Sequence, residues 1–135
     1  MVIWTEKFAT GSSQLDQQHR TLIDHINRLE EMLTITNPTR EECEFMINLV
    51  DFLEDYADTH FKQEEQCMER FRCPSHERNK QAHSQFLAFF RNFKAHFQAE
   101  GFRREVLATL HDTVSQWIEA HILHLDTQLK PFIKG

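Results

Sequence analysis

The sequence predicts an all-α protein, an up-down-up-down four-helix bundle with an N-terminal arm. Apolar residues recur at helical spacing in four long segments, and the few glycines and prolines fall mainly between these segments. No segment shows the alternation that is typical of a strand. Because the connections are short, successive helices should lie antiparallel and side by side. We expect a single domain over residues 1–135, with helices at roughly 13–36, 38–71, 74–100 and 102–129.

The first half of the chain contains the arm and two of the helices. The arm, residues 1–12, carries Trp4 and Phe8, which are candidates to pack against the bundle. Asn37 and Pro38 offer an N-cap and a proline at the first helical position, so we expect the second helix to begin there. The predicted inward stripes consist of Leu15, Leu22, Ile26, Leu29 and Leu33 in the first helix, and of Phe45, Leu49, Phe52, Leu53 and Tyr56 in the second.

The second half contains the other two helices. Pro74 marks the start of the third helix, Gly101 suits the left-handed residue after it, and Pro131 closes the last segment. The predicted stripes consist of Phe86, Phe90, Phe93 and Phe97 in the third helix, and of Leu107, Leu110, Val114 and Trp117 in the fourth.

Composition excludes several classes of function. The chain is 40% hydrophobic and 27% charged, a balance typical of soluble globular domains, and no apolar run approaches the ~20 residues that a membrane helix needs. The N-terminus lacks the pattern of a signal peptide, so we expect a cytoplasmic protein without a membrane partner. A net charge of -6 without a basic patch argues against nucleic acid as a partner. Three cysteines without C-x-x-C spacing argue for reduced thiols.

Polar residues interrupt the apolar stripes of all four predicted helices. The interrupting residues are His19 in the first helix, His60 and Glu64 in the second, Asn79 and His83 in the third, and His121 in the fourth. Any one of these histidines could be an ordinary hydrogen-bonded core residue. Donors at a comparable depth in four helices favour a common cause, because burying polar groups without partners is costly. Imidazole and carboxylate ligands suit iron, zinc or manganese.

The first two helices carry motifs that resemble those of the bacterial hemerythrins. The D-x-Q-H motif of that family matches residues 16–19, Asp-Gln-Gln-His. The H-F-x-x-E-E motif matches residues 60–65, His-Phe-Lys-Gln-Glu-Glu, with Met68 following.

The last two helices extend the resemblance over nearly the whole chain. The third-helix pattern P-x-x-x-x-H-x-x-x-H-x-x-F matches at Pro74, His83 and Phe86, but Asn79 stands where the family has its first histidine. The fourth-helix pattern W-x-x-x-H-I-x-x-x-D is matched by Trp117, His121, Ile122 and Asp126.

The resemblance implies an oxygen-binding centre of two iron ions with an oxo or hydroxo bridge, in a domain that is not an enzyme. One iron would be held by His19 and His60 and the other by His83 and His121, with bridging carboxylates from Glu64 and Asp126. Dioxygen or small anions would be the exogenous ligands. Apolar walls would come from residues at or beside the matching positions, namely Phe61, Phe86, Trp117 and Ile122. Members of the family are often fused to a signalling output such as a diguanylate cyclase, so a fused or separate output domain is a further expected partner.

Helical spacing alone disagrees with the resemblance at one ligand. Asp126 lies five residues after His121, about 140° around an ideal helix, whereas His124 lies only three residues after it. Periodicity therefore favours His124. The family pattern favours Asp126, which can reach inward if the helix loosens near its end.

The chain departs from the family at Asn79, where the family has a seventh ligand, a histidine. An amide oxygen is a weak ligand for iron, and His76, two turns before His83 or ~10.5 Å along the helix, is too far away to replace the missing histidine. Lys80 points to another face. We therefore expect an open coordination position at Asn79 that admits water or an anion and makes the iron prone to autoxidation.

That open position favours an oxygen or redox sensor. Three alternatives stay open: a reversible oxygen carrier or store, a diiron oxidase or peroxidase, and a metal-storage bundle. His25, His96 and His111 are given no role in the site.

Overall fold

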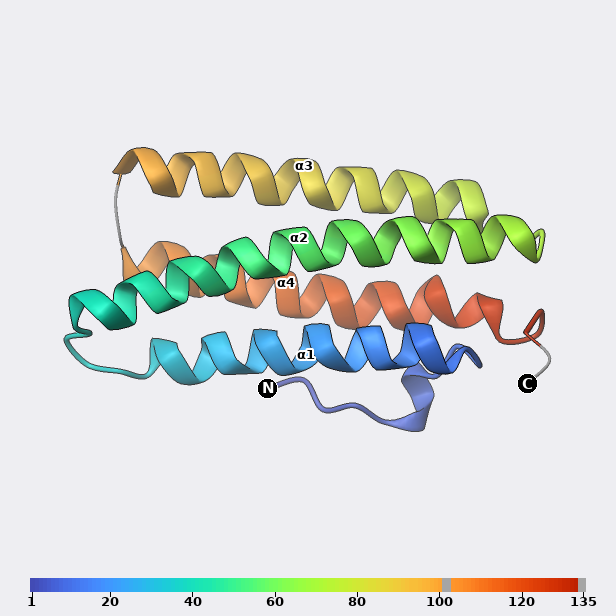
Figure 1. The fold of residues 1–135 in the computed structure, drawn as a ribbon, viewed down its shortest axis with the longest axis horizontal. Coiled ribbons are helices and arrows are strands. Elements are labelled where there is room, and N and C mark those ends of the chain that lie inside the picture. Colours follow the sequence, from blue (N-terminus) through green and yellow to red (C-terminus); the bar gives the residue numbers. More distant parts are fainter. Residues whose placement is uncertain (101–102, 134–135) are drawn as a thin grey trace.

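The computed structural model is a bundle of four long antiparallel helices (Figure 1). It describes residues 1–100 and 103–133, apart from the side chains of residues 96–98 and 100. The helices are α1 (Ser13–Leu33), α2 (Arg40–Arg70), α3 (His76–Glu100) and α4 (Arg104–His124), with short 3-10 helices η1 (Glu6–Phe8) and η2 (Asp126–Leu129). The helices alternate in direction along the chain, and no strand occurs within these described ranges. The predicted all-α four-helix bundle is confirmed.

The start of α2 differs from the sequence-based expectation. Thr39, not Asn37, is the N-cap: its hydroxyl accepts a hydrogen bond from the Glu42 backbone N–H at 3.1 Å, and its own N–H donates to the Glu42 carboxylate at 2.9 Å. This reciprocal pair is a capping box. Asn37 instead has a φ of 53°, a left-handed conformation within the connection between α1 and α2. The expected cap at Asn37 and helix start at Pro38 are therefore wrong, and the helix begins at Arg40.

The other helix ends lie within a few residues of their expected positions. Helix α1 ends at Leu33, where Thr34 caps it, and α3 begins at His76, two residues after Pro74. Helix α4 ends at His124, and the four residues of η2 replace the end of the single long helix expected there. The expected helix start at Phe102 and left-handed residue at Gly101 lie outside the described residues, as does the side chain of Phe97, which was expected in the core.

One expected part of the core lies at the surface. Phe45 and Phe52 are 39% and 40% exposed, although their spacing suggested that they face inward. Arg28 lies over the Phe45 ring at 5.3 Å from its centroid, and His25 stacks on Phe52 at 4.4 Å, so both rings pack along the outside of α1 and α2. The inward face of α2 consists of Met46, Leu49, Val50, Leu53, Ala57, His60, Phe61, Glu64 and Met68.

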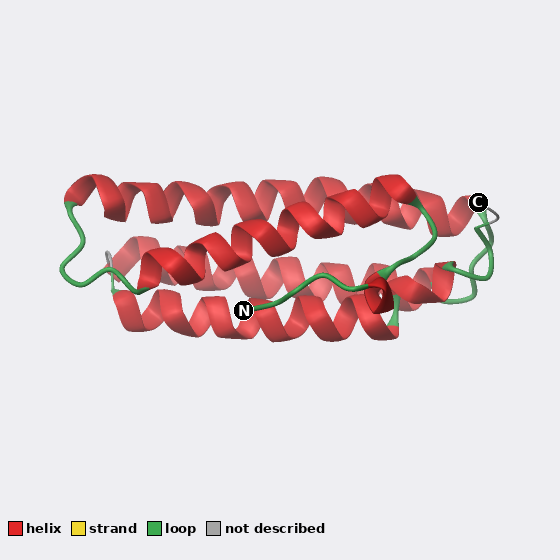
Figure 2. Ribbon diagram, turned by 90° about the horizontal axis from the view of Figure 1, so that it is seen from below, coloured by secondary structure: helices red, strands yellow, loops and turns green. Residues whose placement is uncertain are grey.

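The arm packs along the bundle before α1 begins (Figure 2). The Val2 N–H donates to the Asn27 side chain at 3.1 Å, and the Asn27 amide donates back to the Val2 carbonyl at 2.7 Å. Phe8 is buried and Trp4 half-buried, with the Arg20 guanidinium 4.7 Å from the centroid of the Trp4 ring. These contacts fix the arm on α1. In the ranges that the structure describes, no helix is both long and apolar enough to cross a membrane.

Candidate metal centre

All six predicted ligands meet inside the bundle. His19 comes from α1, His60 and Glu64 from α2, His83 from α3, His121 from α4 and Asp126 from η2, and none is more than 6% exposed. Their donor atoms form two groups of four, each with its atoms within 4.8 Å of one another. The first group is His19, His60, Glu64 and Asp126, and the second is Glu64, His83, His121 and Asp126.

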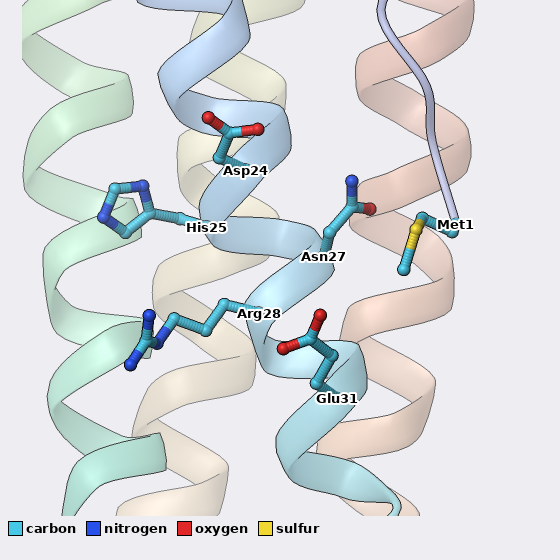
Figure 3. Close-up of a pocket in the computed structure, with 6 residues that line it drawn as sticks. All are labelled: Met1, Asp24, His25, Asn27, Arg28 and Glu31. Carbon is cyan, nitrogen blue, oxygen red and sulfur yellow. The ribbon is translucent and has the colours of Figure 1, made fainter.

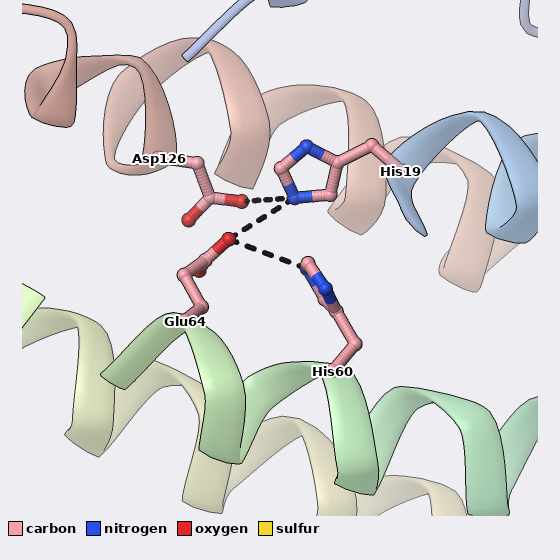
Figure 4. Close-up of side chains that lie close together, drawn as sticks. All are labelled: His19, His60, Glu64 and Asp126. Atoms are coloured by element: carbon pink, nitrogen blue, oxygen red, sulfur yellow. Dashed lines mark hydrogen bonds and ion pairs between the residues drawn. The ribbon is translucent and has the colours of Figure 1, made fainter. Parts of the chain in front are cut away.

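Both carboxylates belong to both groups because each directs one oxygen toward each side. Figure 4 shows the first side, where His19 Nε2 lies 3.1 Å from Glu64 Oε2 and 3.1 Å from Asp126 Oδ2. His60 Nε2 lies 3.3 Å from the same Glu64 oxygen, since residues four apart share one face of α2.

The second side uses the other oxygen of each carboxylate. His83 Nε2 lies 3.2 Å from Glu64 Oε1, and His121 Nε2 lies 3.1 Å from Asp126 Oδ1. The two imidazole nitrogens are themselves 3.0 Å apart. Each carboxylate is thus placed to bridge two cations, one beside His19 and His60 and the other beside His83 and His121.

The end of α4 explains how Asp126 reaches the cluster. The α-helix stops at His124, Leu125 has φ -117° and ψ -53°, and the tighter η2 turn begins at Asp126. Asp126 is 1% exposed, whereas His124 is exposed. The inference from regular helical spacing, that His124 faces the site, is wrong: His124 is the last residue of α4 and is exposed, and the change of backbone after it brings Asp126 into the cluster instead.

Asn79 lies in the cluster but contacts it through its amide nitrogen. Its Nδ2 donates to Glu64 Oε1 at 2.9 Å and to Asp126 Oδ1 at 3.1 Å, and lies 3.2 Å from the Met68 sulfur. The side chain is 0% exposed, and its Oδ1 has no hydrogen-bond partner. The residue in the position of the missing histidine is therefore a hydrogen-bond donor to both carboxylates.

Two side chains orient the histidines, and the sequence patterns did not predict a role for either. The Nδ1–H of His60 donates to Gln18 Oε1 at 2.6 Å, and the Nδ1–H of His83 donates to Glu65 Oε2 at 2.9 Å. Each contact directs the Nε2 of its ring toward the carboxylates, as partners of metal-bound histidines commonly do. Gln18 and Glu65 lie inside the recognised motifs, and that was the available signal. Both side chains are only half-buried and polar, so neither belongs to the apolar stripes by which periodicity identifies inward-facing positions.

Aromatic rings cover the second side of the cluster. Phe61 stacks on His83 with centroids 3.9 Å apart, and Trp117 stacks on His121 at 4.2 Å. Phe86 in turn lies 4.2 Å from Trp117, and Ile122 is 1% exposed. This packing restricts rotation of both imidazoles and excludes water from one flank of the site.

The protonation of the cluster reflects its charge pairs. Burial lowers the pKa of His19, but hydrogen bonds and charges from Asp126 and Glu64 outweigh burial and raise the pKa to about 10. For Glu64, burial raises the pKa, but contacts with histidines including His19 and His60 outweigh it and hold the pKa well below its ordinary value. The pKa of His83 is raised by Glu64 in spite of burial. The pKa shifts of His19, Glu64 and His83 therefore all favour positively charged imidazole beside negatively charged carboxylate.

The other histidines lie apart from this cluster. His76 is half-buried and pairs with Glu77 at 3.6 Å, and His25 donates to the Thr21 carbonyl at 2.7 Å. His111 is buried and contacts Asp112, while the side chain of His96 lies outside the described residues. Neither of the two donor groups includes any of them, nor Lys80, which is exposed.

A surface hollow of about 380 Å³ lies elsewhere, along α1 (Figure 3). Its lining consists of Met1, Asp24, His25, Asn27, Arg28 and Glu31, none of them a predicted ligand.

The donor set fits two transition-metal ions. Four imidazoles and two shared carboxylates supply nitrogen and oxygen ligands in the proportions that suit iron, manganese or zinc. The shared carboxylates fit a dinuclear centre better than a single ion, because each would otherwise leave one buried oxygen without a cation.

Comparisons with known proteins agree over nearly the full chain. The family model of the hemerythrin HHE cation binding domain matches residues 10–133. A bacteriohemerythrin of Stenotrophomonas maltophilia is 26% identical over 122 residues, 90% of this chain and 74% of that protein. One of Clostridium acetobutylicum is 24% identical over 131 residues, 95% of this chain and 98% of that protein. The fold matches the crystal structure of a wild-type hemerythrin with a TM-score of 0.84 and 23% identity, covering 100% of this chain and 99% of that one.

Proposed function

Because this chain belongs to the hemerythrin HHE cation binding domain family, we propose that its buried cluster holds two iron ions and binds dioxygen. Residues 1–135 would form one such domain, a binding module and not an enzyme. The observation that supports the two ions is the pair of carboxylates, each with one oxygen toward each histidine pair. Bound iron would supply the redox chemistry that dioxygen binding requires.

Each ion would have four protein ligands. His19, His60, Glu64 Oε2 and Asp126 Oδ2 would hold the first ion, and His83, His121, Glu64 Oε1 and Asp126 Oδ1 the second. An oxo or hydroxo bridge would complete the pair. Gln18 and Glu65 keep His60 and His83 in the correct tautomer, and the rings of Phe61 and Trp117 keep water from the second side.

Asn79 supports a sensing role over simple oxygen delivery. Asn79 replaces the third histidine that the family places at the second ion. Its amide hydrogens are donated to the two carboxylates, so the side chain would not replace that histidine as a ligand. An ion with fewer protein ligands admits water or a small anion, which promotes oxidation in air. A carrier must return dioxygen unchanged, whereas a sensor needs a site that changes oxidation state. The oxidised state would be communicated to a signalling output domain, fused or separate.

Stopped-flow spectroscopy of the anaerobically reduced protein tests this role. The reduced wild type should oxidise soon after mixing with dioxygen, and Asn79→His should slow that oxidation about ten-fold or more. Lys80→His is the matched control, because it adds a histidine at the next, exposed position of α3 and should not change the rate. Equal oxidation rates in wild type and Asn79→His would refute the role given to Asn79.

The alternative is a reversible carrier or store. The observation in its favour is the apolar cover formed by Phe61, Phe86 and Trp117, since a dry flank slows the loss of bound oxygen. A wild-type protein that forms a stable oxygenated species, releases dioxygen under argon and repeats the cycle would establish this alternative.

A further inference from the structure

We propose that the two metal positions differ in affinity and fill in order, because the Asn79 amide competes with the metal at the His83–His121 position. The inference rests on the proposed dinuclear function and specifies how that site is loaded. Asn79 would thus act by hydrogen bonding, as a determinant of metal affinity, and not as a ligand.

The contacts of Asn79 are confined to one side of the cluster. Its Nδ2 lies 2.9 Å from Glu64 Oε1 and 3.1 Å from Asp126 Oδ1, the same two oxygens that face His83 and His121. An NH₂ group has two hydrogens, so it can donate one to each carboxylate. The amide therefore occupies lone pairs that a cation at this position would need.

The orientation of the amide is fixed by its surroundings. Turning the Asn79 side chain by 180° would place Oδ1 against the two carboxylates and leave the two N–H donors without acceptors. The observed orientation instead leaves only Oδ1 unpaired, in a fully buried side chain. Asn79 cannot offer its oxygen to a metal without giving up both hydrogen bonds to Glu64 and Asp126.

The first side of the cluster has no comparable competitor. In the described part of the chain, Glu64 Oε2 and Asp126 Oδ2 contact only imidazole nitrogens, at 3.1 to 3.3 Å. A metal entering there displaces protons but no amide. On the second side it must also replace the contact between His83 Nε2 and His121 Nε2, which lie 3.0 Å apart.

Ordered filling follows from this difference. The first ion should enter between His19 and His60, and the second should bind more weakly beside His83 and His121. A hydrogen bond to a charged group corresponds to about a ten-fold change in affinity or more, and Asn79 makes two. A form with one metal at the His19–His60 position should therefore be populated at one equivalent of metal.

Titration of the metal-free protein with Co(II) under argon tests the inference without dioxygen or activity. Cobalt reports its ligands through visible absorption, and calorimetry with Zn(II) gives both dissociation constants independently. The wild type should show two steps whose dissociation constants differ by about ten-fold or more. His60→Ala should remove the tighter step, and His83→Ala should remove the weaker one.

Two substitutions at Asn79 separate hydrogen bonding from ligation. Asn79→Leu keeps the approximate size and removes the amide, so it should tighten the second step, whereas the loss of a ligand would weaken it. Asn79→His should bring the two dissociation constants to within about three-fold of each other. Lys80→His is again the control and should leave both steps unchanged. Circular dichroism verifies the helix content of each variant. The two-step titration of the wild type tests ordered filling even if a variant does not fold.

The outcomes distinguish this inference from the proposed function. Two equal steps in the wild type would overturn ordered filling, and a weaker second step in Asn79→Leu would overturn the competition by Asn79; either result would leave the dinuclear site intact. Binding of fewer than two metals at saturation would overturn the proposed function itself.

Discussion

The turn from Asp16 to His19 gives three neighbouring side chains three different tasks. Asp16 accepts hydrogen bonds from the backbone N–H and the hydroxyl of Thr10, both at 2.8 Å, and so ties the arm to α1. Gln18 accepts from His60, and His19 faces both carboxylates. This short motif thus holds the arm through Asp16, orients His60 through Gln18 and supplies the predicted ligand His19.

At the residue scale, Glu65 should control the affinity of the second metal. Glu65→Ala removes the acceptor of the His83 Nδ1–H, so the dissociation constant of the weaker step should rise about 10–100-fold, as is typical when such partners are lost. Glu65→Gln keeps a hydrogen-bond acceptor, so it should raise that dissociation constant by a smaller factor. Glu69→Ala, an exposed site on the same helix, is the control. An unchanged cobalt titration in Glu65→Ala would show that this contact does not act on the metal.

The raised pKa of His19 predicts proton release on metal binding. With its pKa at about 10, His19 is protonated at pH 7 in the metal-free protein, whereas a metal ligand must be neutral. Filling the first position should therefore release about one proton from His19 at pH 7, and less as the pH approaches 10. An indicator dye in weakly buffered solution measures this release. No release at pH 7 would contradict the protonated ion pair.

At the element scale, the end of α4 determines the last ligand. Leu129 is 0% exposed and packs with Leu15, Met68 and Cys73 in a small second core beneath η2. This contact holds the 3-10 turn whose first residue is Asp126. A ligand position therefore depends on an apolar side chain three residues further along the chain.

Leu129→Ala should accordingly weaken both stability and metal binding. Truncating a buried leucine lowers the free energy of unfolding by about 2–5 kcal/mol, and here the loosened η2 should also weaken both metal steps. Leu29→Ala is the matched control, because Leu29 in α1 is also buried, at 2% exposed, but lies in the main core among residues other than the ligands. Urea unfolding and cobalt titration compare them. Equal metal affinity in the two variants would exclude a role for η2.

The helices and the ligands that they carry show how much of the structure could be predicted from the sequence. Helical periodicity predicted the four helices, and the resemblance, now supported by the family match, named the six side chains that the structure brings together. Periodicity failed at Phe45 and Phe52, since aromatic rings can pack on an outer groove at the same spacing as core residues. It failed to predict Asp126 because the break after His124, which brings Asp126 into the cluster, is not visible in a regular pattern. The donor role of Asn79 depends on the orientation of an amide, which no sequence motif encodes.

At the scale of the whole molecule, the cluster connects all four helices at one level of the bundle. Its ligands come from α1, α2, α3, α4 and η2, so bound metal would link every long element. Without metal, only protons and hydrogen bonds offset the charge of the buried Glu64 and Asp126 carboxylates. The metal should therefore contribute substantially to stability.

Removing the metal should lower the thermal midpoint. A ligand present at 100 times its dissociation constant stabilises the folded state by about 2.7 kcal/mol, so two ions should raise Tm by roughly 10 °C or more. Calorimetry of the loaded protein before and after chelation measures the difference. His60→Ala should show a smaller change. An unchanged Tm after chelation would contradict a structural contribution from the metal.

The proposed function requires that the cluster hold two iron ions in one coupled centre. Iron analysis and Mössbauer spectroscopy of protein loaded anaerobically with iron-57, then oxidised in air, test it most directly. We expect two irons per chain, with two different environments because Asn79 affects only one side, and a coupled diferric pair with a diamagnetic ground state. One iron per chain or none, or two magnetically independent ions, would contradict it.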